Sequence, residues 1–177
     1  MSNLQDAFKI VHFKNCHERL FDGSLINAVD LYDTLEMLDG SMPTFTPERE
    51  LYILTLEELV VFDIESGGGG NAKKFLSEIE TYSRETRIKD QFVLIEYLIL
   101  QSMYLLSTGD PEGAMSAIRS YKSLTTSPGV EDIDSTYVAA FARNMDSLSE
   151  LMPLFKARMK NMLDSHFEWI LDVISKR

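Results

Sequence analysis

Apolar residues along the chain recur at spacings of three and four residues, the period of one face of an α-helix. The alternation expected of a strand does not develop, and the apolar run at 60–62 is too short to predict one. We therefore predict an all-α protein. The pattern and its end signals predict eight helices, at about 4–21, 24–38, 47–64, 72–86, 89–107, 111–125, 132–151 and 153–175.

Capping residues and prolines mark where several of these helices begin. Thr46 precedes Pro47 and Asp110 precedes Pro111, so each pair supplies an N-cap followed by a proline at the first helical position. Pro153 predicts the start of the last helix in the same way. Glycines stand between the segments, where a helix can end and the chain can turn.

Three segments share one further spacing, a glycine followed by an alanine five residues on and a large apolar residue four beyond that. The glycine ends a helix, the small alanine lets the next helix approach closely, and the large residue fills the space between neighbouring helix pairs. The pattern resembles the tetratricopeptide repeat over about residues 4–126. Its copies are Gly23, Ala28 and Tyr32; Gly67, Ala72 and Leu76; and Gly109, Ala114 and Ile118.

The resemblance implies stacked antiparallel helix pairs in a right-handed superhelix, closed by C-terminal capping helices. The repeats are divergent, because their alanines are 44 and 42 residues apart, whereas the standard repeat has about 34 residues. An unrelated helical bundle with glycine turns is the alternative. We expect one domain over 1–177, with helix pairs at about 4–39, 47–86 and 89–126, a C-terminal pair at 132–175 and a flexible glycine loop at 66–71.

Length and composition limit the class of protein. The 177 residues, 45% hydrophobic and 25% charged, are typical of one globular domain and exclude a wholly disordered chain. The net charge of -11 argues against direct nucleic-acid binding. The lone Cys16 excludes an intrachain disulfide framework. No secretory signal or membrane-length apolar run is evident, so we expect a cytoplasmic or nuclear protein without a membrane span.

The sequence offers little chemistry of the kind that enzymes and metal sites need. His12, Cys16 and His17 are the nearest approach to a metal-binding group, but a structural zinc takes four ligands and His166 is distant in the sequence. We interpret Cys16 as a packed side chain beside two partly exposed imidazoles, and expect no metal or cofactor. The neighbouring carboxylates at 57–58 and at 78 and 80 are typical of a solvated helix face.

A partner-binding groove is the functional expectation that the repeat register allows. Its positions on the first helices are apolar or acidic, so the basic clamp by which tetratricopeptide domains grip acidic chaperone C-termini is not expected here. A basic or amphipathic helix, or an extended segment, of another protein would suit such a groove. The candidate binding residues are Phe13, His17, Leu54, Glu57, Glu58, Val61, Glu96, Ile99, Met103 and Trp169.

Two alternatives stay open for these residues. The groove positions can instead be core, and the helix with Trp169 can be a cap over the last repeat, a partner-binding helix or a self-association face. We predict a non-enzymatic interaction scaffold or adaptor, a subunit of a larger assembly. A small chaperone or regulator of one client is the alternative, and an enzyme with a scattered Glu, His and Lys site is a third.

Overall fold

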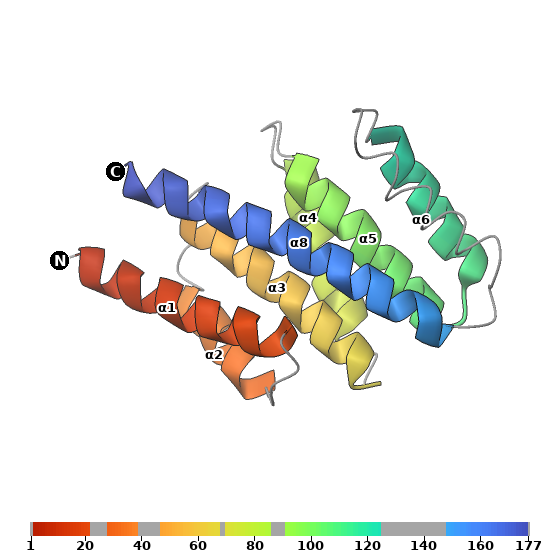
Figure 1. Ribbon diagram of the computed structural model, residues 1–177, viewed down its shortest axis with the longest axis horizontal. Coiled ribbons are helices and arrows are strands. Elements are labelled where there is room, and N and C mark those ends of the chain that lie inside the picture. The colour runs from red at the N-terminus through yellow and green to blue at the C-terminus, as the bar shows by residue number, and fades with distance from the viewer. Residues whose placement is uncertain are drawn as a thin grey trace.

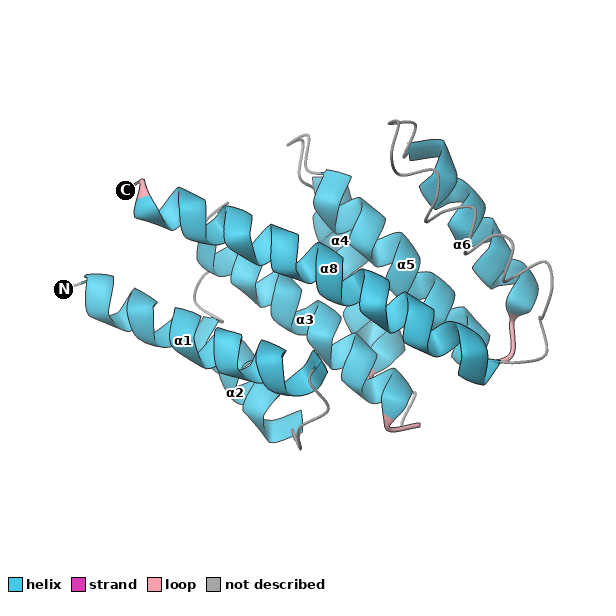
Figure 2. Cartoon of the chain, viewed as in Figure 1, coloured by secondary structure: helices cyan, strands magenta, loops and turns pink. Residues whose placement is uncertain are grey.

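The computed structural model describes residues 2–21, 28–38, 47–67, 70–85, 91–124 and 148–176, which form helices joined by turns. Those residues contain no strand (Figure 2), which confirms the all-α prediction for them. The helices are α1 (Ser2–Phe21), α2 (Ala28–Leu38), α3 (Pro47–Glu65), α4 (Ala72–Glu85), α5 (Gln91–Ser107), α6 (Pro111–Leu124) and α8 (Leu148–Ser175).

The last helix differs from the prediction. It was expected to begin at Pro153, but α8 begins at Leu148 and contains the proline. A proline inside a helix removes one backbone hydrogen bond and costs about 3 kcal/mol. Pro153 is exposed, and the side chains of Phe155 and Met159 just beyond it are fully buried, so packing offsets the cost. The helix predicted at 132–151 lies mostly outside the described residues.

Side-chain caps fix the starts of two helices. Helix α6 begins at Pro111 as predicted, and the Asp110 carboxylate accepts a hydrogen bond of 2.9 Å from the Gly113 N–H. Helix α4 is anchored from its neighbour, because the Asp63 carboxylate at the end of α3 accepts a 2.8 Å hydrogen bond from the Ala72 N–H. Helix α3 begins at Pro47 as predicted, while its expected N-cap at position 46 lies outside the described residues.

The glycine and alanine positions of the repeat pattern behave as the spacing predicts where they are described. Gly67 and Gly109 adopt left-handed φ angles of 70° and 82°, which favour glycine at the end of a helix. Ala72 and Ala114 are fully buried, so each lets its helix approach a neighbour closely. Gly23, the first copy's glycine, lies outside the described residues.

The large residue of the pattern is buried in two copies and not in the third. Leu76 and Ile118 are buried, as expected for side chains between helix pairs. Tyr32 is 41% exposed, because α2 lies at the edge of the molecule and no earlier helix pair covers it. Its ring still reaches Phe75 of α4, with the ring centroids 6.1 Å apart.

The helices form two layers with a third element laid across one of them. Consecutive helices pack as the pairs α1–α2, α3–α4 and α5–α6, and α2 and α4 each also contact the next pair. Helices α1, α3 and α5 lie side by side, and α8 runs alongside α3 and α5 on the face away from α4 (Figure 1). The start of α1 and the end of α8 lie at the same side of the molecule.

Helix α3 lies at the centre of this arrangement. It contacts α1, α2, α4, α5 and α8, and residues 53–61 are all buried, including both carboxylates in that stretch. A helix buried on every side has no solvated stripe. The polar side chains of α3 must therefore be satisfied inside the protein, and this requirement defines the candidate site.

Candidate functional site

The structure places the predicted groove residues in the interior of the chain. Nine of the ten candidates are buried, and eight of them have an exposed fraction of 0%. The prediction that positions 57 and 58 form a solvated helix face is wrong, because α8 covers the side of α3 on which they lie. The buried candidates are Phe13, His17, Leu54, Glu57, Glu58, Val61, Glu96, Ile99 and Met103, while Trp169 is partly exposed.

Two polar clusters lie between α8 and the helices beneath it. The first, here called the inner cluster, consists of Glu50 and Glu57 of α3, Glu96 of α5 and His166 of α8, all with an exposed fraction of 0%. His166 Nε2 lies 2.9 Å from Glu50 Oε2, and Nδ1 lies 2.9 Å from Glu96 Oε1. The hydroxyl of Tyr82 in α4 donates to the other oxygen of Glu50. The inner cluster therefore joins four helices.

Glu57 is the unsatisfied member of the inner cluster. Neither of its carboxylate oxygens has a hydrogen-bond partner among the described residues. Burial raises the pKa of Glu57 well above its ordinary value, and the charges of Glu96, Glu50 and Glu58 raise it further. A free carboxylate at this position is therefore strongly disfavoured unless a cation accompanies it.

His166 is the positive centre of the inner cluster. Burial opposes its charge, but the carboxylates of Glu96 and Glu50 outweigh that effect and raise the pKa of His166 to about 10. Both ring nitrogens face carboxylates, so both N–H groups donate. The Trp169 ring lies beside the imidazole, with centroids 6.0 Å apart.

The second cluster, here called the edge cluster, consists of His17 of α1, Glu58 of α3 and Asp164 of α8. His17 Nδ1 lies 2.6 Å from Glu58 Oε1, and Nε2 lies 2.6 Å from Asp164 Oδ1. Asp164 is 37% exposed, and it also accepts a 2.6 Å hydrogen bond from Lys160. The edge cluster thus reaches solvent on one side, whereas the inner cluster does not.

Charges within the edge cluster support one another. Burial opposes a charge on His17, but Glu58 and Asp164 together raise its pKa above the ordinary value. Burial also acts against the charge of Asp164, yet hydrogen bonds from Lys160 and His17 lower the pKa of that carboxyl. Burial raises the pKa of Glu58, and His17 partly offsets this. Here each acid has a basic partner.

His12, Cys16 and His17 are the residues for which the sequence predicts packed or partly exposed side chains and not a metal site. Cys16 is buried as predicted, and its sulfur lies 3.9 Å from His12 Nε2 and 3.6 Å from the Asp30 carbonyl. Burial raises the pKa of the Cys16 thiol, so the thiolate that metals bind is scarce. His17 was expected to be partly exposed, but it is buried in the edge cluster.

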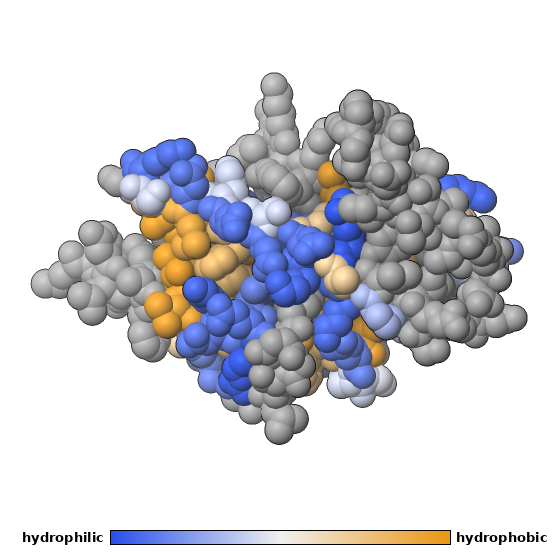
Figure 3. Space-filling model, in the orientation of Figure 1, coloured by the Kyte–Doolittle hydropathy of each residue, from blue (hydrophilic) through white to orange (hydrophobic). Residues whose placement is uncertain are grey.

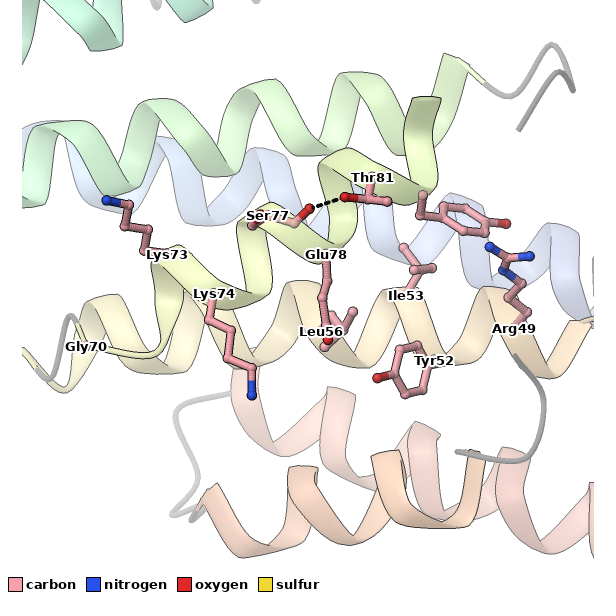
Figure 4. A pocket seen from close by; sticks show the side chains of 11 residues that line it. Arg49, Tyr52, Ile53, Leu56, Gly70, Lys73, Lys74, Ser77, Glu78 and Thr81 are labelled. Atoms are coloured by element: carbon pink, nitrogen blue, oxygen red, sulfur yellow. Dashed lines mark hydrogen bonds between the residues drawn. The ribbon is translucent and has the colours of Figure 1, made fainter. Parts of the chain in front are cut away.

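An open groove lies on another face of α3, between α3 and α4 (Figure 4). Its volume is about 670 Å³, and none of the ten candidate residues lines it. Lys73 and Lys74 on α4 approach it from the side of the glycine turn, and Glu78 lies between them and Tyr52. A phosphate-binding loop follows a β-strand. The glycine turn before α4 follows a helix, α3, and therefore does not match such a loop.

Little apolar surface is exposed on the described residues. The large apolar side chains that reach solvent are Val11 of α1, Tyr32 of α2 and Leu171 of α8. Figure 3 shows hydrophobic surface next to the carboxyl end of α8.

No protein-family model, no curated protein and no solved structure matches this chain. None of the described helices is long and apolar enough to cross a membrane. The functional argument therefore rests on the side chains themselves.

Sequence reasoning identified part of both clusters and missed the rest. Glu57, Glu58, Glu96 and His17 were candidates, but as contacts for a separate protein. His166 was set aside because it is distant in the sequence. One signal was available: an acid at position 50 stands seven residues before the one at 57, so both lie on one face of a helix, and the residues between them are mostly apolar.

Proposed function

We propose that the protein is a non-enzymatic interaction scaffold or adaptor whose partner helix binds the groove formed by α1, α3 and α5. The observation that supports this function is the place of α8. It lies across the groove and contacts α3 and α5 along its length, as a bound helix would. In the isolated chain α8 is thus an intramolecular occupant of the groove.

The contacts of α8 combine an apolar stripe with polar pairs at intervals. Its buried stripe includes Phe155, Met159, Leu163 and Ile170, each with an exposed fraction of 0%. Polar pairs extend from one end of the helix to the middle. They are Lys156 with Glu65 at 2.8 Å, Asp164 with His17 at 2.6 Å, and His166 with Glu50 and Glu96 at 2.9 Å.

Acidic residues on the inner face favour an occupant that can exchange. A permanently covered face is most stable when it is apolar, because ionised groups lose hydration when buried. Glutamates cost less on a surface that water reaches while the occupant is away. A partner helix with Lys or Arg at the positions of His166 and Lys156 would pair with the same carboxylates.

The finer architecture is part of this proposal. Left-handed glycines before α4 and α6, and buried alanines within those helices, support tetratricopeptide-like stacking of three helix pairs in a right-handed superhelix. In such a stack the first helix of each pair lines the groove, and here those helices are α1, α3 and α5. The C-terminal α8 then both covers the groove and limits access to it.

The test is to lock α8 in place and to measure whether a second helix can still replace it in the groove. In a Glu65→Cys, Lys156→Cys variant, a short bismaleimide links the two positions, whose charged groups lie 2.8 Å apart. Binding of a fluorescent peptide of residues 148–175 is measured by anisotropy. We expect the unlocked chain to bind the peptide and the locked chain to lose that binding, because the tethered α8 cannot leave.

The controls are the two variants that each add one cysteine to the buried native Cys16, treated with the same reagent, which carry the modification without the tether. They should bind the peptide as the untreated chain does. Binding that survives the lock, or no binding by the unlocked chain, would count against an exchangeable groove. Proteins captured by the unlocked chain and lost on locking would then identify the partner, either as an assembly subunit or as a single client.

A further inference from the structure

Three side chains from three helices converge in the inner cluster with donor atoms suited to a metal ion. Glu57 of α3, Glu96 of α5 and His166 of α8 each offer one ligand atom, and these atoms all lie within 4.8 Å of one another. All three residues have an exposed fraction of 0%. The donors are therefore preorganised by the packing of separate helices.

The state of Glu57 is an independent indication of a missing cation. Its carboxylate is fully buried, and neither oxygen has a hydrogen-bond partner among the described residues. Native proteins rarely leave a buried polar atom unsatisfied, because the group loses its hydration without compensation. Glu57 faces Glu96, and two ionised carboxylates cannot satisfy each other, so either a shared proton or a cation has to lie between them. Ionised Glu57 therefore needs a cation at this place.

The surroundings of His166 match those of a metal-binding histidine. In such a histidine one ring nitrogen binds the metal. The N–H of the other nitrogen usually donates a hydrogen bond to a carboxylate, and this bond fixes the orientation of the ring. His166 Nε2 lies 2.9 Å from Glu50, and Glu50 is held in turn by the Tyr82 hydroxyl. Nδ1 points to the side of Glu96, 2.9 Å from its Oε1. Glu50 and Tyr82 thus form an outer layer, and Nδ1 faces the ligands.

We propose that Glu57, Glu96 and His166 bind a divalent transition-metal ion of the Zn²⁺ class. One imidazole nitrogen and two carboxylate oxygens are ligands that such ions accept, with a fourth position for water. Ca²⁺ is disfavoured, because it takes about 6–8 oxygen ligands. On binding, the ion replaces the proton that Nδ1 donates to Glu96 and the proton that the buried Glu57 carboxyl carries, and both protons are released to solvent.

The ion would tie α8 to α3 and α5. Its three ligands come from these three helices, so the bound metal holds α8 in the groove more firmly than the hydrogen bonds alone. The inference stands apart from the proposed function, because metal binding is measured on the chain by itself. If the groove also exchanges its occupant, the metal favours the closed form.

The experiment titrates the full, untagged chain with Co²⁺ and Zn²⁺ after treatment with a chelator and its removal. Co²⁺ gives visible absorption bands that report its ligands, and calorimetry with Zn²⁺ gives the stoichiometry. We expect one ion per chain and a rise in the melting temperature with Zn²⁺. Ca²⁺ at the same concentration should produce neither effect.

Matched variants separate the proposed site from other ways of binding metal. Glu57→Gln and Glu96→Gln keep side-chain size and each remove one ligand, so each should weaken Zn²⁺ binding by roughly 100-fold or more. Glu58→Gln is the control, because Glu58 is adjacent and equally buried but belongs to the edge cluster. It should change the affinity by less than about threefold, a difference well below that expected for a lost ligand. Cys16→Ser should likewise retain binding.

Several outcomes would overturn the proposal. One is the absence of stoichiometric Zn²⁺ binding by the wild-type chain. Another is binding that survives both Glu57→Gln and Glu96→Gln, which would place the ion elsewhere. Loss of binding in Cys16→Ser would assign the metal to the group around Cys16 instead. Circular dichroism of each variant establishes whether it is folded. If one of the two glutamine variants does not fold, the other still tests the site.

Discussion

Glu57 and Glu58 are neighbours in the sequence and are both fully buried, yet their surroundings are opposite. Glu58 has a histidine at 2.6 Å, and that histidine reaches Asp164, which is partly solvated. Glu57 faces Glu96 and has no hydrogen-bond partner among the described residues. The comparison teaches that burial alone does not decide what a carboxylate does. The charge balance of its cluster decides it.

The two clusters differ in how they compensate for buried charge. In the edge cluster one histidine serves two acids, and Lys160 adds a second cation at the solvent side. In the inner cluster one histidine serves Glu50 and Glu96, and Glu57 is left over. The inner cluster therefore holds one acid more than its cation can satisfy. For this reason the metal ion is proposed for the inner cluster and not for the edge cluster.

The largest effect is expected from removing the cation of the inner cluster. His166→Ala removes the cation that faces both Glu50 and Glu96, leaves Glu50 to the neutral Tyr82 hydroxyl, and opens a cavity between α3, α5 and α8. We expect the free energy of unfolding to fall by about 3–5 kcal/mol, the usual cost of breaking a buried ion pair. Urea unfolding of wild type and variant at neutral pH measures it. A loss below about 1 kcal/mol, the scale of a surface pair, would show that the inner cluster is not a closed network.

A smaller effect is expected in the edge cluster, and it should depend on pH. His17→Gln removes two charged hydrogen bonds, so we expect a loss of about 1–3 kcal/mol at pH near 6. The folded-state pKa of His17 lies above its ordinary value of 6.5. The stabilisation is therefore complete below that value and is lost as pH rises through the folded-state pKa. The difference between variant and wild type should shrink as pH rises above about 6.5 and through the folded-state pKa.

The other groups that face His17 do not reverse this trend. Asp164 has a lowered pKa, so it stays charged throughout the window. Glu58 has a raised pKa, so its ionisation also lowers stability as pH rises and does not reverse the trend. Unfolding measured by urea at several pH values tests the prediction, and a cost that grows with pH would contradict it.

Much of the fold was predictable because its determinants are local. The apolar period and the prolines at 47 and 111 placed the helices within a few residues, since caps and periodicity act within one helix. The start of α8 was missed because packing of its apolar face outweighs the cost of Pro153, and that packing depends on distant helices. Tyr32 was misassigned for a related reason, because a repeat pattern does not reveal which pair stands at the end.

The candidate site was less predictable than the fold. The register placed Leu54, Glu57 and Ile99 on the inner side of their helices, and all three are buried, but the register left open what covers them. The answer lies more than sixty residues further on, in α8. Acidic residues on one face of a helix predict exposure to solvent unless the basic residue that pairs with them is known. Here that residue is His166, which lies 70 positions from Glu96 in the sequence. Only the tertiary structure supplies such pairings.

The most direct test of the account compares Glu57→Gln with Glu58→Gln in the metal-free chain at neutral pH. Both changes replace a carboxyl group with an amide on the same helix at equal burial. Glu57→Gln should raise the free energy of unfolding by about 1 kcal/mol or more, because it removes an acid that lacks a partner. Glu58→Gln should lower it by about 1–3 kcal/mol, because His17 loses its carboxylate. Opposite signs in urea unfolding are the predicted result. A similar loss in both variants would contradict the claim that the two clusters differ in charge balance.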